Sequence, residues 1–206
     1  MPKTEPFEKH SEAYDAWFER NRAIYEAELK LIENLLPRNI SNALEVGVGT
    51  GRFAAPLGIK NGVEPAEKMA EMAEKRGVDV RRGVAENLPF PDATFDLVLM
   101  VTTVCFVDDI LRSFQEAFRV LMPGGGVVVG FVDKESDQGK RYLEKKANSD
   151  FYRHATFVST TSVLKKLRKA GFETIDIKQS LIPGQNPDVI ASGFGKGGFV
   201  AVKAKR

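Results

Sequence analysis

Residues 95–101, Phe-Asp-Leu-Val-Leu-Met-Val, form an almost unbroken apolar run. Such a run is typical of a strand that is covered on both faces, as in the middle of a parallel sheet. Six further segments have a strand-like composition: 43–46, 62–64, 78–82, 127–132, 172–178 and 198–203. Segments of helical periodicity lie between several of them, including 66–76 and 110–121. This alternation predicts an α/β chain in which helices cover both faces of a mostly parallel sheet.

The length and composition predict one globular unit. The chain has 206 residues, which fits a single domain over 1–206. Basic and acidic residues number 30 and 28, so charge gives no reason to expect nucleic acid as a partner. No apolar run approaches the roughly 20 residues of a membrane helix, and no signal peptide is expected from the polar N-terminus. Cys105 is the single cysteine, which precludes an intrachain disulfide and fits a cytoplasmic protein.

Three glycines follow the first strand-like segment at once: Gly47, Gly49 and Gly51. Glycine permits a positive φ and lets a ligand approach the backbone closely, and we expect a short helix after the loop. The spacing differs from the dinucleotide pattern Gly-x-Gly-x-x-Gly, whose third glycine is replaced by Arg52. Glu45, just before the loop, suits a cationic ligand better than a phosphate. We expect Glu45 to help hold a cationic amino group, directly or through the loop; a tight turn that binds nothing is the alternative.

Glu64 ends the second strand-like segment, next to the glycine loop on the same rim of the expected sheet. Ligands of such sheets bind beyond the carboxyl ends of the strands. A carboxylate there can accept hydrogen bonds from both hydroxyls of a ribose, at ~1.5–3 kcal/mol each. An exposed salt bridge is the alternative role. Because nicotinamide enzymes also use an acid in a similar place, Glu64 supports a ribose rather than one particular cofactor.

The chain resembles class I S-adenosylmethionine-dependent methyltransferases in five segments, in the order that these enzymes show. The segments are 44–51 (motif I, Leu-Glu-Val-Gly-Val-Gly-Thr-Gly), 62–65 (the ribose-binding strand end), 83–96 (the adenine-lining segment and the entry to strand four), 119–125 (the turn before strand five) and 171–172 (the start of strand six). The most similar subgroup includes quinone-biosynthesis and many small-molecule enzymes. The resemblance implies a Rossmann-like, doubly wound, mostly parallel seven-stranded sheet with helices on both faces and an antiparallel last strand.

The resemblance also implies S-adenosyl-L-methionine as the cofactor and assigns residues to it. Gly47 and Gly49 would flank the methionine end of the cofactor. Glu64 would hold the ribose, with Pro65 beside the adenine. The implied reaction is methyl transfer to a small-molecule acceptor by in-line displacement, which needs a positioned nucleophile more than it needs a base. The motifs indicate neither the acceptor atom nor the oligomeric state.

Further residues follow from the resemblance in the loops after the third and fourth strands and in the leading segment. Ala85 would offer its backbone N–H to the adenine, with Glu86 next to it. Thr102 would face the methionine end and the transferring methyl group. Residues 1–37 are expected to form a helical lid in which Tyr14 closes over the site, with core packing as the alternative role for Tyr14. The segment 134–158 reads as an insertion that shapes the substrate site.

Two positions depart from the family pattern. Val84 stands where an acidic residue often accepts from the adenine amino group, so a backbone carbonyl or a water would have to serve. Cys105-Phe106 replace a frequent histidine pair, so no catalytic residue is identified; His154 in the insertion is a candidate, and an ordinary surface residue is the alternative. No metal is expected, because no His/Cys/Asp cluster has ligand spacing. A non-catalytic S-adenosylmethionine-binding protein and an NAD(P)-dependent oxidoreductase remain as alternatives.

Overall fold

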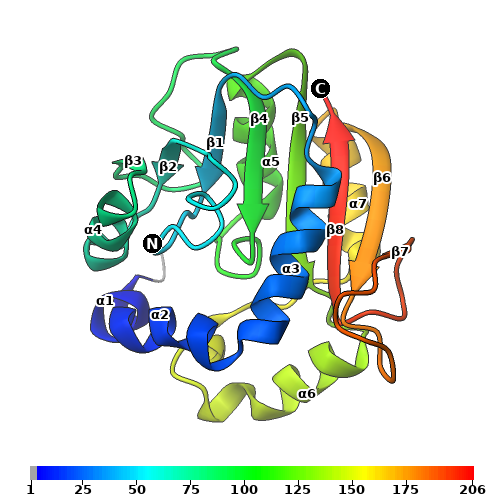
Figure 1. Cartoon of the computed structure of the whole chain (residues 1–206). Coiled ribbons are helices and arrows are strands. Elements are labelled where there is room, and N and C mark those ends of the chain that lie inside the picture. The colour runs from blue at the N-terminus through cyan, green and yellow to red at the C-terminus, as the bar shows by residue number, and fades with distance from the viewer. Residues whose placement is uncertain (1–3) are drawn as a thin grey trace.

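The computed structural model describes residues 4–206, and its centre is one eight-stranded sheet in the order β3-β2-β1-β4-β5-β8-β6-β7 (Figure 1). The strands are β1 (Ala43–Val46), β2 (Asn61–Val63), β3 (Asp79–Arg81), β4 (Phe95–Val101), β5 (Leu121–Val132), β6 (Glu173–Ser180), β7 (Ala191–Ser192) and β8 (Phe199–Lys205). Strands β1 to β5 pair in parallel, whereas β8 is antiparallel to both β5 and β6. The predicted Rossmann-like sheet is confirmed. It has eight strands rather than seven because the two-residue strand β7 pairs with the edge of β6.

Helices cover both faces of the sheet, as the sequence predicts (Figure 1). They are α1 (Glu5–Lys9), α2 (Ser11–Arg20), α3 (Arg22–Leu35), α4 (Glu67–Lys75), α5 (Ile110–Val120), α6 (Asp137–Lys145) and α7 (Thr160–Lys169), with the 3-10 turns η1 (Lys146–Asn148) and η2 (Tyr152–His154). The apolar stripes of α3 and α4 pack in one core cluster, and those of α5 and α7 pack in the other. Burial of one stripe per helix against the sheet stabilises this layered arrangement.

The carboxyl ends of β1, β2 and β4 lie at one edge of the sheet, and the connections at that edge build the site. Within the described part of 1–37, α1 and α2 lie at this edge, whereas α3 runs along a face of the sheet (Figure 1). Residues 1–3 of the expected lid lie outside the described residues. The 134–158 segment forms α6, η1 and η2 and lies at the same edge.

The prediction of a short helix after the glycine loop is wrong. Residues 52–58 form successive turns, in which the N–H of Ala55 donates to the carbonyl of Gly51 at 3.1 Å. A regular helix does not develop because Pro56 has no N–H to donate and Gly58 has a φ of +72°, outside the helical region. The segment therefore leads directly back into β2.

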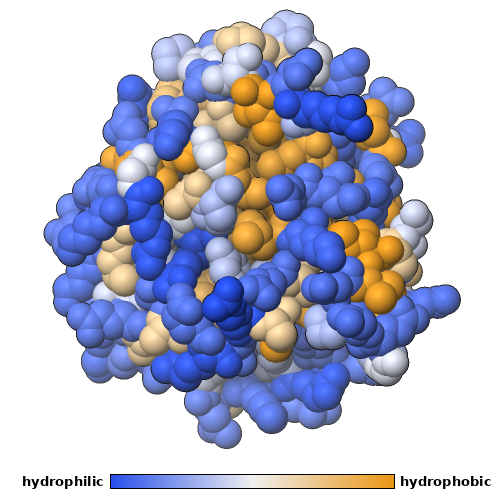
Figure 2. All heavy atoms as spheres, viewed as in Figure 1, coloured by the Kyte–Doolittle hydropathy of each residue, from blue (hydrophilic) through white to orange (hydrophobic). Residues whose placement is uncertain are grey.

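The face seen in Figure 2 is largely hydrophilic, with apolar side chains gathered over α3 and in the region of β7. Within residues 4–206, no helix combines the length and the apolar composition needed to cross a bilayer. The same residues contain no group of His, Cys, Asp and Glu side chains arranged to hold a metal ion.

Candidate functional site

The glycine loop turns sharply at the end of β1. The N–H groups of Gly47 and Val48 donate to the carbonyl oxygen of Val63 at 2.8 and 3.0 Å, which holds the loop against the end of β2. Gly47 has a φ of +69° and Gly49 a φ of +56°, in the left-handed region that favours glycine. A Cβ atom on Gly47 would lie 2.5 Å from Cγ2 of Thr103. The loop therefore requires glycine at position 47 both for its backbone angle and for space.

Both carboxylate oxygens of Glu64 are engaged by the backbone around the loop. Oε2 accepts from the N–H of Gly49 and Oε1 accepts from the N–H of Ala66, each at 3.0 Å. The residue is 7% exposed. Burial raises the pKa of Glu64 to about 7, although the two backbone hydrogen bonds favour its charged form. Each oxygen has lone-pair capacity left, so Glu64 can also accept hydrogen bonds from hydroxyl groups of a ligand.

A cavity of about 440 Å³ opens beside Glu64, a volume typical of small-molecule sites. Eight of the nine residues that the sequence assigns to the cofactor line this one cavity: Tyr14, Gly47, Gly49, Glu64, Pro65, Ala85, Glu86 and Thr102. They come from α2 and from the loops after β1, β2, β3 and β4. The fold thus brings together residues that are distant in the sequence at the carboxyl edge of the sheet, as expected for this class of sheet.

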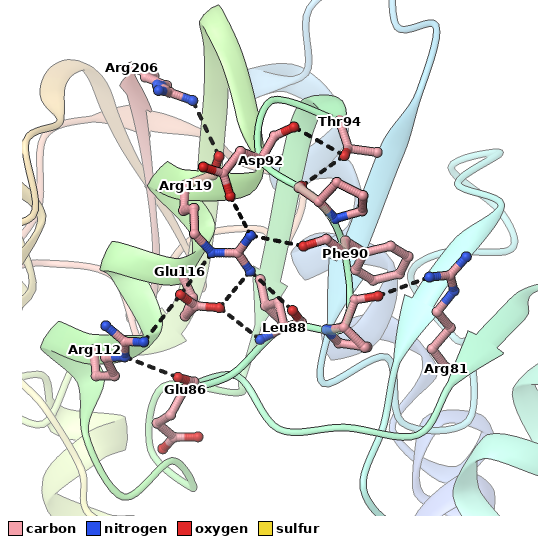
Figure 3. Close-up of polar contacts among 12 residues, drawn as sticks. Arg81, Glu86, Leu88, Phe90, Asp92, Thr94, Arg112, Glu116, Arg119 and Arg206 are labelled. Atoms are coloured by element: carbon pink, nitrogen blue, oxygen red, sulfur yellow. Dashed lines mark hydrogen bonds and ion pairs between the residues drawn. The ribbon is translucent and has the colours of Figure 1, made fainter.

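Helix α5 fixes the segment that carries Ala85 and Glu86 (Figure 3). The N–H of Leu88 donates to Oε2 of Glu116 at 2.9 Å. Arg119 donates to the carbonyl oxygens of Leu88 and Phe90, at 3.0 and 2.8 Å, and to Asp92 at 2.8 Å. Glu116 and Arg119 pair at 2.8 Å, and this hydrogen bond lowers the pKa of Glu116. The charged pair therefore supplies hydrogen-bond partners to backbone groups of a loop that forms no β-sheet hydrogen bonds along most of its length.

Glu86 also organises the loop after β4. Its Oε1 accepts from the N–H groups of Asp108 and Asp109, at 2.7 and 3.1 Å, while Arg112 donates to its carbonyl oxygen at 3.2 Å. Val84 lines the cavity with an apolar side chain and forms an isolated bridge with Asn87. The 83–92 segment therefore gives the cavity the apolar side chain of Val84, and its Glu86 carboxylate is bonded to the backbone at the start of α5.

Glu45 is the predicted site residue that does not line the cavity. It is 1% exposed, and its carboxylate accepts a hydrogen bond from the backbone of Ala54 in the turns behind the loop. Within residues 4–206, its Oε2 has no hydrogen-bond partner. Burial raises the pKa of Glu45 well above its ordinary value, and the nearby Glu64 raises it further. Because Glu45 does not line the cavity, the role that fits the structure is the indirect one, in which Glu45 acts on a cationic ligand through the loop.

Helix α2 is held over the loop by a partly buried ionic contact. Asp15 accepts from Nε and Nη2 of Arg52, at 2.9 and 2.6 Å, and from Nη2 of Arg76 at 2.9 Å. Burial raises the pKa of Asp15, but these hydrogen bonds outweigh it and hold the pKa at about 2. One residue earlier, Tyr14 places its hydroxyl 4.0 Å from a Cβ atom built on Gly49. Burial raises the pKa of Tyr14, so its phenol stays neutral at physiological pH.

The residues that line the cavity differ in part from those predicted from the sequence. Phe7, Met69, Thr103 and Phe106 line the cavity although the sequence did not single them out for the cofactor. Position 106 was marked only by the absence of the family's histidine pair, and Phe7 carried no motif signal. His154 is exposed at the end of η2 and is not among the lining residues, so the geometry does not support it as a catalytic residue.

Comparisons with known proteins agree with this geometry. Residues 44–129 match the family model described as "Methyltransferase domain". The crystal structure of a SAM-dependent methyltransferase from Thermotoga maritima, described as a possible histamine N-methyltransferase, is 46% identical; the match has a TM-score of 0.92 and covers 98% of each chain. An uncharacterized protein of Methanocaldococcus jannaschii is 40% identical over 97% of this chain and 98% of its own length. A ubiquinone/menaquinone biosynthesis C-methyltransferase of Rickettsia typhi is 29% identical over 81% of this chain and 76% of its own length.

The fold, the glycine loop and the cavity beyond β1, β2 and β4 define a class I S-adenosylmethionine-dependent methyltransferase. Together with the similarity to the Thermotoga maritima enzyme over almost the whole chain, they show that this chain belongs to that family. Its methyl donor is S-adenosylmethionine, and the oxidoreductase alternative is not supported.

The affinity for S-adenosylhomocysteine is expected to fall as the pH decreases from 8 to 5.5. The pKa of Glu64 is about 7, and a ribose would donate its hydroxyls to the charged carboxylate, so below pH 7 binding must first remove a proton. Glu8 and Arg82 act on the same carboxylate with opposite signs. The decline should approach tenfold per pH unit. Calorimetric titration over this range measures it, and Glu64→Gln should flatten the profile; an unchanged slope in that variant would assign the pH dependence to another group.

Proposed function

We propose that this methyltransferase acts on a small-molecule acceptor that binds where Tyr14 and Thr102 face the cavity. The observation that carries the proposal is the composition of the cavity. The same 440 Å³ space is bounded by Glu64, by the glycine loop, and by Tyr14 and Thr102, and most of its lining is apolar. A concave, largely apolar space of this size suits an adenosyl cofactor with a compact acceptor.

Within this proposal, different residues of the cavity wall bind the ribose, the adenine and the methionine end of the cofactor. Glu64 accepts from the ribose hydroxyls while its bonds to Gly49 and Ala66 keep it in place. Pro65 and Val84 contact the adenine, and the backbone of Ala85 donates to it. When bound, the cofactor supplies a methyl group on a positively charged sulfur. The absence of a Cβ at Gly47 and Gly49 leaves room for the methionine end.

Methyl transfer is then a matter of orientation and exclusion of water. Phe7, Tyr14 and Phe106 contribute aromatic rings to the cavity wall, with Phe7 5.0 Å from Phe106 and 5.7 Å from Tyr14 between ring centroids. Holding reactants in line can lower a barrier by ~7–11 kcal/mol, and a low-dielectric site favours a step in which charge disperses. Three residues with carboxylates line the cavity within residues 4–206; Glu64 and Glu86 already accept backbone hydrogen bonds, and Asp108 is the third. We favour in-line displacement without a dedicated base, because the transfer depends mainly on orientation.

An amine nitrogen is the acceptor atom that we favour. The description of the Thermotoga maritima enzyme as a possible histamine N-methyltransferase supports this choice, because that protein is similar over 98% of this chain. A neutral amine has a free lone pair at the reacting nitrogen, so it can attack a methyl group without a strong base.

The proposal is tested by calorimetry followed by a transfer assay. S-adenosylmethionine and S-adenosylhomocysteine should bind to the purified protein, and NADH should not. Release of S-adenosylhomocysteine should then depend on an added primary amine and not on the matching alcohol. Cofactor binding without transfer to any member of an amine, phenol and thiol panel would contradict the proposed acceptor class and would favour a cofactor-binding protein without turnover.

A further inference from the structure

Arg52 directly follows the glycine loop and connects it to helices α2 and α3. Its guanidinium donates to two carboxylates of α2, that of Asp15 and that of Glu19. The same group lies 5.6 Å from the ring centroid of Phe18, which also belongs to α2. The carbonyl oxygen of Arg52 accepts from the hydroxyl of Tyr25 on α3 at 2.6 Å. The residue at the end of the glycine loop therefore holds α2 mainly through charge.

Arg76 at the end of α4 adds a second cation to the carboxylate of Asp15. Its Nη2 donates to Oδ2 of Asp15 at 2.9 Å, and its Nη1 donates to the carbonyl oxygen of Thr50 at 2.8 Å. The side chains of Asp15, Arg52 and Arg76 are 13%, 17% and 28% exposed, whereas that of Glu19 is 65% exposed. Water therefore weakens the pairs of Asp15 less than it weakens the pair of Glu19. We call Asp15, Arg52 and Arg76 the ionic clamp, because these residues join α2 to the glycine loop and to α4.

Tyr14 precedes Asp15 on α2 and forms part of the cavity wall. Its Cε1 and its hydroxyl oxygen would lie 3.9 and 4.0 Å from a Cβ atom built on Gly49. Burial raises the pKa of Tyr14, and a hydrogen bond with the side chain of Thr102 acts against this rise. The ring also packs edge-on against Phe151, at 5.6 Å between centroids. The position of α2 therefore decides whether Tyr14 meets the glycine loop and the end of β4.

The ionic clamp and the cavity hold different sides of α2. Successive residues of an α-helix point about 100° apart, so Asp15 anchors one side of the helix while Tyr14 faces the cavity from another. Two anchors of this kind fix the rotation of the helix as well as its position. A ligand that contacts Tyr14 in this position stabilises the position, and by the same linkage the ionic clamp stabilises the bound ligand.

We infer that Asp15 is a positioning residue: its ion pairs with Arg52 and Arg76 hold Tyr14 over the bound cofactor, and they must break before α2 can move aside and release it. Asp15 does not line the cavity, so in this scheme it acts through Tyr14. The inference goes beyond the proposed function, because it concerns retention of the cofactor and applies whatever the acceptor is. The pKa of Asp15 is about 2, so the ionic clamp stays charged at neutral pH and salt is the suitable perturbation.

The test measures how fast bound tritium-labelled S-adenosylhomocysteine is displaced by an excess of the unlabelled compound. Asp15→Asn is compared with Glu12→Gln, which removes the same charge from an exposed position of α2. Dissociation should be about 10- to 100-fold faster from Asp15→Asn, because charged hydrogen bonds are lost, and unchanged in Glu12→Gln. Salt screens the charges that opening exposes. Raising NaCl from about 0.05 to 0.5 M should therefore speed dissociation from the wild type and Glu12→Gln, but hardly from Asp15→Asn.

Trp17 provides a second readout that follows α2 itself. It is the single tryptophan of the chain, lies two residues after Asp15, and packs edge-on against Phe18 at 5.3 Å between centroids. Acrylamide should quench its fluorescence more strongly in Asp15→Asn than in the wild type, both with and without S-adenosylhomocysteine. Thermal unfolding of the same samples shows whether each variant is folded at the temperature of the assay.

Two further variants separate the ionic clamp from a general loss of structure. Asp15→Glu keeps the charge and should restore slow dissociation at least in part. Arg76→Gln removes one of the two cations and leaves the pair with Arg52, so its rate should lie between those of the wild type and Asp15→Asn; it also serves as the test if Asp15→Asn does not fold. A folded Asp15→Asn protein with a dissociation rate within twofold of the wild type, an unchanged salt profile in that variant, unchanged quenching of Trp17, or equal acceleration by Glu12→Gln would each overturn the inference.

Discussion

Glu64→Ala is expected to weaken the binding of S-adenosylhomocysteine by about 100- to 10,000-fold. Two charge-assisted hydrogen bonds to the ribose would be lost, at ~1.5–3 kcal/mol each. The change also removes the acceptor of the N–H groups of Gly49 and Ala66, both at 3.0 Å, so the loop loses the contact that fixes it. Isothermal titration of the wild type and the variant at pH 8 measures the effect.

Two variants show whether the loss comes from the ribose contact. Glu64→Gln keeps the size of the side chain and one acceptor oxygen, so its affinity should lie between those of the wild type and Glu64→Ala. Glu67 lies three residues after Glu64, is exposed and pairs with Arg82, so Glu67→Gln should bind like the wild type. A Glu64→Ala protein that is folded and binds within threefold of the wild type would contradict the assignment of Glu64 to the ribose.

Gly47→Ala is expected to destabilise the protein by about 2–5 kcal/mol and to abolish cofactor binding. A non-glycine residue with a positive φ costs ~1–2 kcal/mol, and overpacking adds ~1–3 kcal/mol. The added Cβ would lie 2.5 Å from Cγ2 and 2.7 Å from Oγ1 of Thr103, whose hydroxyl donates to the carbonyl of Val46. The loop must therefore move away from β4, and the space beside Gly49 changes with it. Chemical denaturation and calorimetry measure the two effects.

Gly58→Ala is the matched control for the energetic cost of a positive φ in a non-glycine residue. Gly58 has a φ of +72°, almost the +69° of Gly47, but a Cβ atom there would meet nothing within 4 Å. Its substitution should cost only about 1–2 kcal/mol and leave cofactor binding unchanged. If both variants lose the same stability and both still bind S-adenosylhomocysteine, then crowding against Thr103 is not what requires glycine at position 47.

Much of the fold was accessible from the sequence because it depends on local periodicity. The apolar run that became β4 is buried along nearly its whole length, and its neighbours alternate with amphipathic helices, so a parallel sheet covered on both faces follows. The connection after Gly51 was predicted incorrectly. Its composition resembles a helix over a few residues, but the tertiary path back into β2 uses Pro56 and Gly58 to break it.

The sequence by itself determined the glycine loop, the acid at Glu64 and the order of the family motifs, because each is a local pattern next to a strand end. It could not decide which way a side chain on a buried strand points, and so it left open whether Glu45 acts directly or through the loop; in the structure Glu45 does not line the cavity. The tertiary structure alone brings Phe7 and Phe106 to the wall on which Tyr14 lies. These relations depend on contacts between segments far apart in the chain, and no local periodicity encodes them.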